Sequence, residues 1–314
     1  MTSQRDVFIT ELFEMAKKDK DIVLLSVDMG APSLDCWRTD LPQQFFAMGI
    51  SEQHSINFAA GLASQGKKVY VYYMAAWSAR CFEQIRYSCA MAKNPITILG
   101  NGVALGYTPA GPAHCPNEDI AYMRSLCDIE IYSPSNNDMI PPLVQLTYQE
   151  PGLRYIRLER KSAPISHLYN KNIWNLDMVK QGITTLKSFE GKSCILSSGY
   201  MLGRAVDAAH ELQKEGMLVD VVDMWKIKNL DLKTFSDHIE KYDKIITLEE
   251  QSLSGGVGSV VCELLADSAL LKPVLRLGLP DGYIFDNGTR DQLIDNSGLS
   301  VDNIVNRIKE SHAN

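Results

Sequence analysis

The stretch Gly49-Ile50-Ser51-Glu52-Gln53-His54, followed by Phe58-Ala59-Ala60-Gly61-Leu62-Ala63, decides how this sequence is interpreted. Its small and apolar residues predict a helix over residues 52–64, with Glu52 in the first turn. A glutamate there has an ordinary explanation, because its negative charge complements the positive end of the helix dipole. The small residues also have an ordinary explanation, since they let the helix pack closely against another backbone. A function for Glu52 therefore depends on the rest of the pattern.

The segments around this helix alternate between helices and short apolar strands. We predict helices over residues 5–18, 80–91, 118–127 and 138–150, and strands over 22–27, 68–73, 95–100, 129–132 and 154–158. Such alternation is typical of a parallel sheet covered on both faces. Residues 101–116 form a loop rich in Gly and Pro that is long enough to suggest a function.

A second α/β pattern follows a polar, irregular stretch over residues 159–174. We predict strands over residues 193–197, 219–223 and 244–248, a helix over 202–215, and a second helix that ends at residue 266. The chain has 314 residues, which favours two domains of roughly 150 residues each. We therefore expect an α/β protein with mostly parallel sheets, divided into domains over residues 1–165 and 175–314.

Composition excludes several classes of function. A formal net charge of −7 argues against nucleic acid as a partner, because phosphate backbones are bound by basic surfaces. The seven cysteines are scattered and never spaced as CxxC, so they indicate neither a disulfide framework nor a zinc site. The charged N-terminal segment does not resemble a signal peptide, and no run approaches the roughly 18 apolar residues of a membrane span. We expect a cytoplasmic protein without a membrane partner.

Five ordered segments carry a resemblance to a known family. Besides the stretch around Glu52, with Val27-Asp28 before it, they are Glu83-Gln84-Ile85-Arg86, Gly111-Pro112-Ala113-His114 with Glu118-Asp119-Ile120-Ala121, Arg154-Tyr155-Ile156-Arg157, and Leu248-Glu249-Glu250-Gln251 with Gly255-Gly256-Val257-Gly258. Together they resemble the pyrimidine-binding domain of transketolases and of 1-deoxyxylulose-5-phosphate synthases, followed by a transketolase C-terminal domain. The resemblance covers nearly the whole chain. It implies thiamine diphosphate as cofactor.

The resemblance implies a catalytic role for Glu52. In such enzymes the glutamate of the G-I-x-E-Q motif contacts N1′ of the aminopyrimidine ring and promotes the proton transfer that activates the cofactor, whose own chemistry then stabilises a carbanion. Trp77 lies where the family places an aromatic ring against the pyrimidine, although a core position is an equally ordinary reading. Arg80 and Asp28 are the remaining candidates for cofactor binding, and a surface salt bridge is the alternative for Arg80.

Two further residues match positions that face the substrate in the family. His114 matches a histidine that shuttles a proton to or from carbonyl and hydroxyl oxygens, whereas an isolated loop histidine would be a surface residue. Arg157 matches an arginine that binds the phosphate of sugar substrates, for which a forked and permanently charged donor is suited. Arg154 and Arg160 are interpreted as solvated neighbours.

The sequence departs from the family in two places. Asn101-Gly102 stands where deoxyxylulose-phosphate synthases have a second phosphate-binding arginine, and the following loop is one residue longer, which puts their substrates in doubt. The G-D-G motif with its later Asn, which anchors the diphosphate and Mg²⁺, does not occur; Pro280-Asp281-Gly282 has the wrong first residue. We therefore expect a partner chain that holds the diphosphate and the metal, in an assembly of two copies of each chain. This chain by itself should be inactive.

Three alternatives remain open. The β subunit of a 2-oxoacid dehydrogenase has a similar length and the same G-I-x-E-Q motif, although Arg154-Tyr155-Ile156-Arg157 fits transketolases better. A non-catalytic scaffold subunit has no physical need to keep Glu52, His114 and Arg157 together. The turn Gly255-Gly256-Val257-Gly258 could suggest nucleotide binding, but its spacing is not GxGxxG, so we interpret it as a helix entry. The hypothesis is ketol transfer from a ketose to an aldose, as sugar or sugar phosphate.

Overall fold

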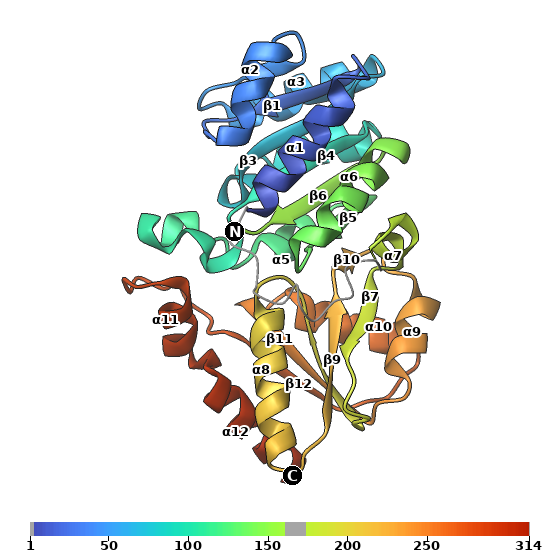
Figure 1. The fold of residues 1–314 in the computed structure, drawn as a ribbon, viewed down its shortest axis with the longest axis vertical. Helices are drawn as coiled ribbons and strands as arrows, with labels where there is room; N and C mark the ends of the chain where they lie inside the picture. Colours follow the sequence, from blue (N-terminus) through green and yellow to red (C-terminus); the bar gives the residue numbers. More distant parts are fainter. Residues whose placement is uncertain (1–2, 161–173, 314) are drawn as a thin grey trace.

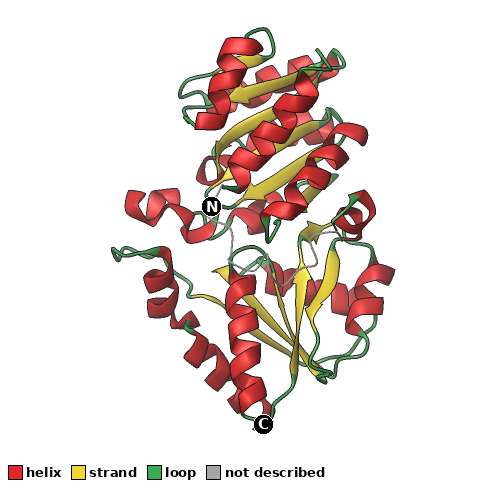
Figure 2. Ribbon diagram, in the orientation of Figure 1, coloured by secondary structure: helices red, strands yellow, loops and turns green. Residues whose placement is uncertain are grey.

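The chain folds around two sheets, as expected for the α/β class. The computed structural model describes residues 3–160 and 174–313. Figures 1 and 2 show one sheet above the other, each flanked by helices. In the described ranges the upper sheet has seven strands and the lower one five. The boundary predicted between residues 165 and 175 lies almost entirely outside the described residues.

The first sheet orders its described strands as β10-β5-β6-β4-β3-β1-β2. They are β1 (Ile22–Ser26), β2 (Phe45–Ala47), β3 (Lys68–Met74), β4 (Ile96–Asn101), β5 (Ile129–Tyr132), β6 (Leu153–Leu158) and β10 (Lys226–Lys228). The pairs among β1 to β6 are parallel, whereas β10 pairs with β5 in the antiparallel direction. Because β10 comes from the second half of the sequence, the C-terminal part of the chain supplies an edge strand of the first sheet.

The alternation of side chains along β3 shows how the sheet is buried on both faces. Val69 and Val71 point into one hydrophobic cluster, which lies against α3 (Glu52–Ser64) and η3 (Ile85–Met91). Tyr70 and Tyr72 point into another cluster on the opposite face, against α1 (Gln4–Ala16) and α6 (Ile140–Gln149). Successive residues of a strand face opposite sides, so a strand that is apolar throughout must be covered twice.

The remaining described helices of the first domain are short. They are α2 (Asp35–Asp40), α4 (Phe82–Gln84) and α5 (Asp119–Met123), with the tighter turns η1 (Pro32–Leu34), η2 (Ala75–Ser78), η4 (Ala104–Ala110), η5 (Pro112–His114) and η6 (Asn137–Met139). The single helix predicted over residues 80–91 is instead α4 followed by η3, which has π-helical bonding. A π-bulge is common near functional sites, and periodicity cannot distinguish it from an α-helix.

The second sheet orders its described strands as β12-β11-β8-β9-β7. They are β7 (Ile183–Lys187), β8 (Ser193–Ser197), β9 (Val219–Met224), β11 (Lys244–Ser252) and β12 (Val274–Leu279). The helices of this domain are α8 (Met201–Lys214), α9 (Leu232–Ile239), α10 (Val257–Asp267), α11 (Arg290–Ile294), η8 (Asp295–Leu299) and α12 (Val301–Ala313). The short helix α7 (Leu176–Gln181) instead packs against α6 of the first domain. β7 is antiparallel to β9, and the other pairs are parallel.

The glycine-rich turn before α10 lets a carboxylate approach the backbone. Glu249 accepts hydrogen bonds from the backbone N–H groups of Val257 at 2.5 Å and Gly258 at 2.9 Å, at the start of α10. A Cβ atom at Gly256 would lie 2.1 Å from Oε2 of Glu249 and 2.7 Å from the carbonyl oxygen of Ser252. The turn is therefore a helix entry, as predicted, and Gly256 is required sterically.

We predict that Gly256→Ala destabilises the chain by about 1–3 kcal/mol, because neither the buried carboxylate nor the backbone carbonyl can move far enough. The matched control is Gly61→Ala, which lies in α3 with no atom within 4 Å of its added Cβ and should stabilise the chain by about 0.5–1 kcal/mol. Urea unfolding followed by circular dichroism measures both. Equal midpoints for the two variants would contradict the steric role of Gly256.

Candidate active site

Most of the predicted site residues follow strands of the first sheet at one edge. Asp28 comes after β1, Trp77 lies in η2 after β3, and His114 lies in the loop after β4. Arg157 stands at the end of β6. Because parallel strands present their carboxyl ends at the same edge, where ligands of open α/β sheets bind, this edge is the candidate active site.

Glu52 is a buried carboxylate at the start of α3. Only 4% of the residue is exposed. Its Oε2 atom lies 3.2 Å from Nη1 of Arg80, and the Arg80 side chain is half exposed. A carboxylate removed from water needs a partner, and the N-terminal end of the helix supplies further favourable charge. Arg80 is therefore a companion of Glu52, and its exposure lets it move away when another group approaches.

Trp77 connects Glu52 and Arg80 to His114. The Arg80 guanidinium lies over the indole ring of Trp77 at 5.3 Å from the ring centroid, which is cation–π geometry. The ring of His114 packs edge to face with Trp77 at a centroid distance of 5.3 Å. The Nδ1 atom of His114 is buried without a hydrogen-bond partner among the described residues. The structure thus brings Glu52, Arg80, Trp77 and His114 into one cluster, which we call the edge cluster.

Asp28 lies apart from these contacts. It is exposed, directly beyond β1, with a backbone φ of +46° that places it in the left-handed region. Such a conformation is uncommon outside glycine, although aspartate tolerates it better than most residues. Within the described chain, no hydrogen bond or ion pair joins Asp28 to the edge cluster, so its role in cofactor binding stays a prediction.

Arg157 is held by groups of its own chain. Its Nε and Nη2 atoms donate to the two carboxylate oxygens of Asp119 at 2.8 and 3.1 Å, and its Nη1 donates to the hydroxyl of Ser133 at 3.0 Å. The guanidinium is buried, and all three nitrogens have partners. Sequence reasoning missed this role of Asp119, because a pairing between residues 38 positions apart leaves no local pattern. Phosphate binding by Arg157 would require Asp119 to release it and stays a prediction.

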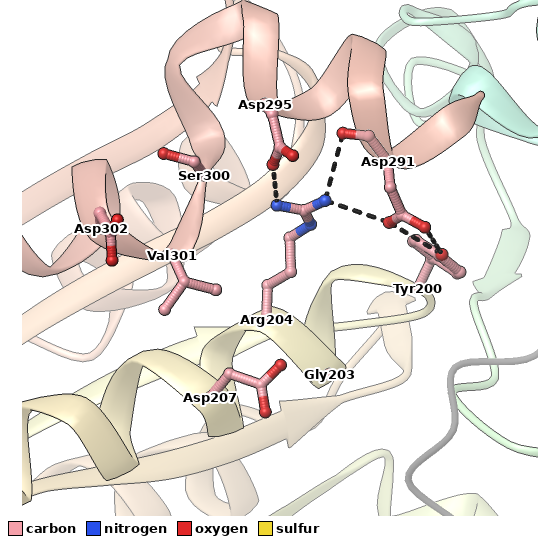
Figure 3. Close-up of a pocket in the computed structure, with 9 residues that line it drawn as sticks. All are labelled: Tyr200, Gly203, Arg204, Asp207, Asp291, Asp295, Ser300, Val301 and Asp302. Carbon is pink, nitrogen blue, oxygen red and sulfur yellow. Dashed lines mark hydrogen bonds and ion pairs between the residues drawn. The ribbon is translucent and has the colours of Figure 1, made fainter. Parts of the chain in front are cut away.

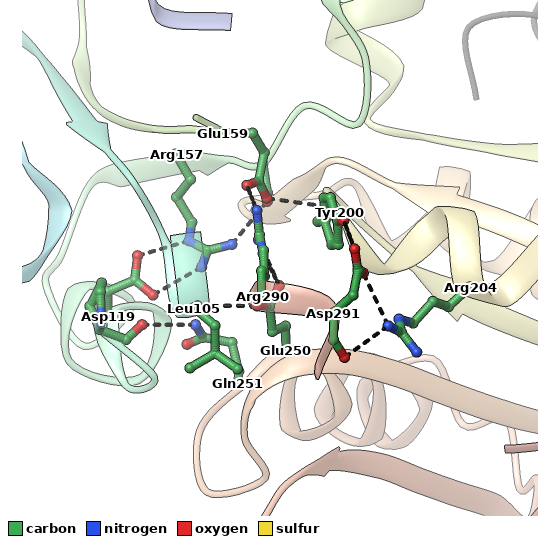
Figure 4. Close-up of polar contacts among 12 residues, drawn as sticks. Leu105, Asp119, Arg157, Glu159, Tyr200, Arg204, Glu250, Gln251, Arg290 and Asp291 are labelled. Atoms are coloured by element: carbon green, nitrogen blue, oxygen red, sulfur yellow. Dashed lines mark hydrogen bonds and ion pairs between the residues drawn. The ribbon is translucent and has the colours of Figure 1, made fainter. Parts of the chain in front are cut away.

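A buried ion-pair network joins the two domains beside Arg157, as Figure 4 shows. Arg290, the first residue of α11, pairs with Glu159 of the first domain at 2.7 Å and with Glu250 of β11 at 2.6 Å. Its guanidinium also lies over the ring of Tyr200, 3.9 Å from the centroid. Glu250 accepts in addition from the backbone N–H of Leu105 at 3.1 Å. The network fixes the loop after β4 against the second domain.

The neighbouring Glu249 has an unusual affinity for its proton. Burial raises the pKa of Glu249 to about 7, against the opposing effect of the two backbone N–H groups at the start of α10 and of Arg276. A small cavity beside it is lined by Arg157, Glu159, Glu249 and Glu250, so the surroundings of Arg157 are rich in carboxyl groups. The carboxyl groups at this cavity are not free, however, because Glu159 and Glu250 are paired with Arg290.

A separate hollow of about 440 Å³ lies in the second domain around Arg204 (Figure 3). The Arg204 guanidinium pairs there with Asp291 at 3.0 Å and with Asp295 at 2.5 Å, and Asp207 and Asp302 also face the hollow. No residue of the edge cluster lines it.

None of the helices within residues 3–160 and 174–313 has the length and hydropathy that crossing a membrane requires.

Comparison with protein families settles the class of this fold. Residues 2–165 match the transketolase pyrimidine-binding domain, and residues 185–304 match the transketolase C-terminal domain. The chain belongs to the transketolase family. The resemblance inferred from the motifs is thereby confirmed, and so is the two-domain α/β fold.

Three relatives of this transketolase-family chain describe the range of similarity. A subunit of the apulose-4-phosphate transketolase of Phocaeicola vulgatus is 32% identical over 307 residues, 97% of this chain and 96% of that protein. 1-Deoxy-D-xylulose-5-phosphate synthase of Caldanaerobacter subterraneus subsp. tengcongensis is 30% identical, but this chain spans only 49% of it. A solved split-gene transketolase, described as an inactive β4 tetramer, has a TM-score of 0.86 at 30% identity, covering 99% of this chain and 98% of that one.

The raised pKa of Glu249 predicts a specific pH dependence of stability. Unfolded glutamate ionises near pH 4.5, whereas the folded group keeps its proton to about pH 7. Since the folded state holds more protons in this window, the contribution of Glu249 to the free energy of unfolding falls as pH rises, by up to about 3 kcal/mol. Glu249→Gln cannot ionise, so the variant should gain this amount relative to wild type between pH 5 and pH 8. Urea unfolding at both pH values measures it, and a difference that does not change with pH would contradict the raised pKa.

Proposed function

We propose that this chain is one subunit of a split, thiamine-diphosphate-dependent transketolase. The reaction moves a two-carbon ketol unit from a ketose to an aldose acceptor. The bond between C2 and C3 of the donor breaks, a new bond forms to the aldehyde carbon of the acceptor, and the donor leaves as an aldose shorter by two carbons. No net oxidation or reduction occurs. The observation that carries the proposal is the edge cluster, in which a buried glutamate, an indole ring and a histidine meet at the carboxyl edge of the sheet.

The edge cluster fits the aminopyrimidine half of the cofactor. Glu52 would hold the N1′ side of the ring, because a carboxylate at 4% exposure with one half-exposed partner can exchange that partner for a ring nitrogen. Trp77 would offer its face to the pyrimidine. When bound, thiamine diphosphate supplies the carbanion chemistry. The diphosphate and Mg²⁺ would be held mainly by the partner chain.

Glu52, Arg80 and His114 have separable tasks. Arg80 keeps the Glu52 carboxylate paired until the ring nitrogen arrives, and its exposed side chain can then turn to solvent. Glu52, itself removed from water, would then hold a proton at the bound ring. His114 has a buried Nδ1 without a partner among the described residues, so it is free to donate to or accept from a carbonyl or hydroxyl oxygen of the substrate.

A second polypeptide is part of the proposal. The similar protein of Phocaeicola vulgatus is named as one subunit of a transketolase, and the similar solved chain is described as an inactive β4 tetramer. Exposed apolar side chains lie on the elements that flank Glu52: Ile50, 75% exposed, precedes α3, and Tyr87 and Met91 lie on η3, which is tied to α3 by a hydrogen bond from Ser88 to Asn57. A patch of this kind is typical of a protein interface. We place the partner on it, in an assembly of two copies of each chain.

Glu52→Gln should reduce ketol transfer by the assembled enzyme roughly 100- to 10,000-fold, since an amide cannot hold and release the proton. Fold and partner binding should be unchanged, because Arg80 can be solvated. The control is Glu11→Gln, an exposed glutamate of α1, which should keep full activity. The assay follows transfer between sugars without a redox dye. Full activity of Glu52→Gln would contradict the role of Glu52, and ferricyanide reduction with a 2-oxoacid would instead indicate a dehydrogenase.

Ile50→Asp should weaken assembly with the diphosphate-binding partner about tenfold or more, because a charge replaces apolar surface that the partner would bury. The matched control is Leu271→Asp, since Leu271 is 98% exposed and lies between α10 and β12 in the second domain. Sedimentation velocity of mixtures at several concentrations measures assembly directly. Equal effects of the two substitutions would show that the partner does not cover Ile50.

A further inference from the structure

A pocket of about 350 Å³ lies between the loop that carries His114 and the second domain. One wall is made by loop residues on both sides of His114, between Pro112 and Pro116, and by Ala76 next to Trp77. The opposite wall is made by Tyr283 and Phe285. In Figure 1 the segment before α11 projects beside the short helical turns that follow β4. The pocket therefore adjoins the segments that carry His114 and Trp77, although its lining is made by their sequence neighbours.

Tyr283 and Phe285 are two exposed aromatic residues separated by one position in the sequence. Their exposed fractions are 67% and 77%, whereas Ile284 between them is partly buried and packs against the hydrophobic cluster of the second domain. Both aromatic residues line the pocket, whereas Ile284 between them packs on the second domain. Two large exposed rings on one irregular segment are unusual for a soluble surface and indicate a binding role.

The charge of the residues that line the pocket disfavours a phosphate. Among its described lining residues there is no Lys, Arg or His, and the one carboxylate is Glu118. Glu118 is half buried beside Asp119, whose own carboxylate is occupied by Arg157. A phosphate dianion next to Glu118 would meet like charge without a counter-ion, which is unfavourable. Hydroxyl groups, in contrast, can donate to the Glu118 carboxylate.

Two polar side chains elsewhere at this edge are already engaged within the chain. Arg157 has all three nitrogens engaged by Asp119 and Ser133, and its cavity is shared with Glu159, Glu249 and Glu250. The side-chain N–H of Asn101, a neutral group, donates to the hydroxyl of Tyr107 at 2.8 Å. The arrangement favours a neutral, hydroxylated ligand whose C–H face packs on aromatic rings.

We propose that this pocket is the subsite for the non-reacting end of the acceptor, and that it takes an unphosphorylated, hydroxylated carbon chain. The aldehyde end would lie toward His114, the C–H face of the chain would pack on Tyr283 and Phe285, and a hydroxyl group would donate to Glu118. The inference rests on the proposed ketol transfer and adds the class of acceptor to it.

The test compares acceptors on the assembled enzyme. 3-Hydroxypyruvate serves as donor: the bond between its carboxylate and carbonyl carbons breaks, CO₂ leaves, and the two-carbon unit adds to the acceptor aldehyde with uptake of one proton. The acceptors are glycolaldehyde, which has only one carbon beyond its aldehyde, D-ribose and D-ribose 5-phosphate. We expect kcat/KM for D-ribose to exceed that for D-ribose 5-phosphate about tenfold or more. A preference for the phosphorylated sugar would overturn the proposal.

The double variant Tyr283→Ala/Phe285→Ala separates the subsite from the reaction. It should lower kcat/KM for D-ribose about tenfold, mainly through KM, and leave glycolaldehyde unchanged. Leu271→Ala, at a 98% exposed position away from the pocket, is the control for loss of an exposed apolar side chain and should retain the wild-type values for both acceptors. An unchanged KM for D-ribose, or an equal loss with glycolaldehyde, would overturn the subsite while leaving ketol transfer intact. If the double variant no longer binds the partner in sedimentation velocity, the subsite is also overturned, and Tyr283 and Phe285 are identified as part of the subunit interface.

Glu118→Gln provides an independent readout of charge. Removing the carboxylate should raise kcat/KM for D-ribose 5-phosphate severalfold relative to D-ribose. An unchanged ratio of kcat/KM between the two acceptors would contradict the repulsion between Glu118 and the phosphate, on which the inference depends. Absence of transfer to glycolaldehyde by the wild-type complex would instead refute the proposed function, and the subsite with it.

Discussion

Arg290 lies between two buried carboxylates that come from different domains, and the geometry of the whole edge depends on this contact. It pairs with Glu159 beyond β6 and with Glu250 on β11, while Glu250 also accepts from the backbone of Leu105. A buried ion pair need not add net stability, but removing one partner leaves an unpaired charge at a cost of about 3–5 kcal/mol. The contact contributes specificity, since few relative positions of the domains satisfy all three groups at once.

The ion pairs of Arg290 explain how two domains with separate sheets together position the residues of the candidate active site. It holds the loop after β4 against the second domain, and that loop carries His114 to Trp77 and the Glu52–Arg80 pair. Arg290 also begins α11, so the preceding segment with Tyr283 and Phe285 is fixed beside the same loop. In the proposed reaction the first domain supplies the reactive groups, and the second domain determines what can reach them.

Local patterns were sufficient for much of the fold. Short apolar segments between helices, such as residues 68–73, indicated strands of a parallel sheet covered on both faces, and the motif around Glu52 indicated the helix and its family. Contacts between residues far apart in sequence were not predictable in this way: the pairing of β10 with β5, the ion pairs of Arg290 and the capture of Arg157 by Asp119 leave no periodic signal. One local sign of a buried ion pair was present in the sequence: two adjacent glutamates, Glu249 and Glu250, follow an apolar strand.

The central claim is that this chain holds half of an active site. Calorimetric titration of thiamine diphosphate with Mg²⁺ into this chain, into its diphosphate-binding partner and into their mixture tests it most directly. The account predicts tight binding in the mixture only, with weak or undetectable binding to this chain by itself. Tight binding to the isolated chain would contradict the division of the site, and a mixture that binds no more cofactor than the partner does would mean that Glu52 and its neighbours do not serve the cofactor.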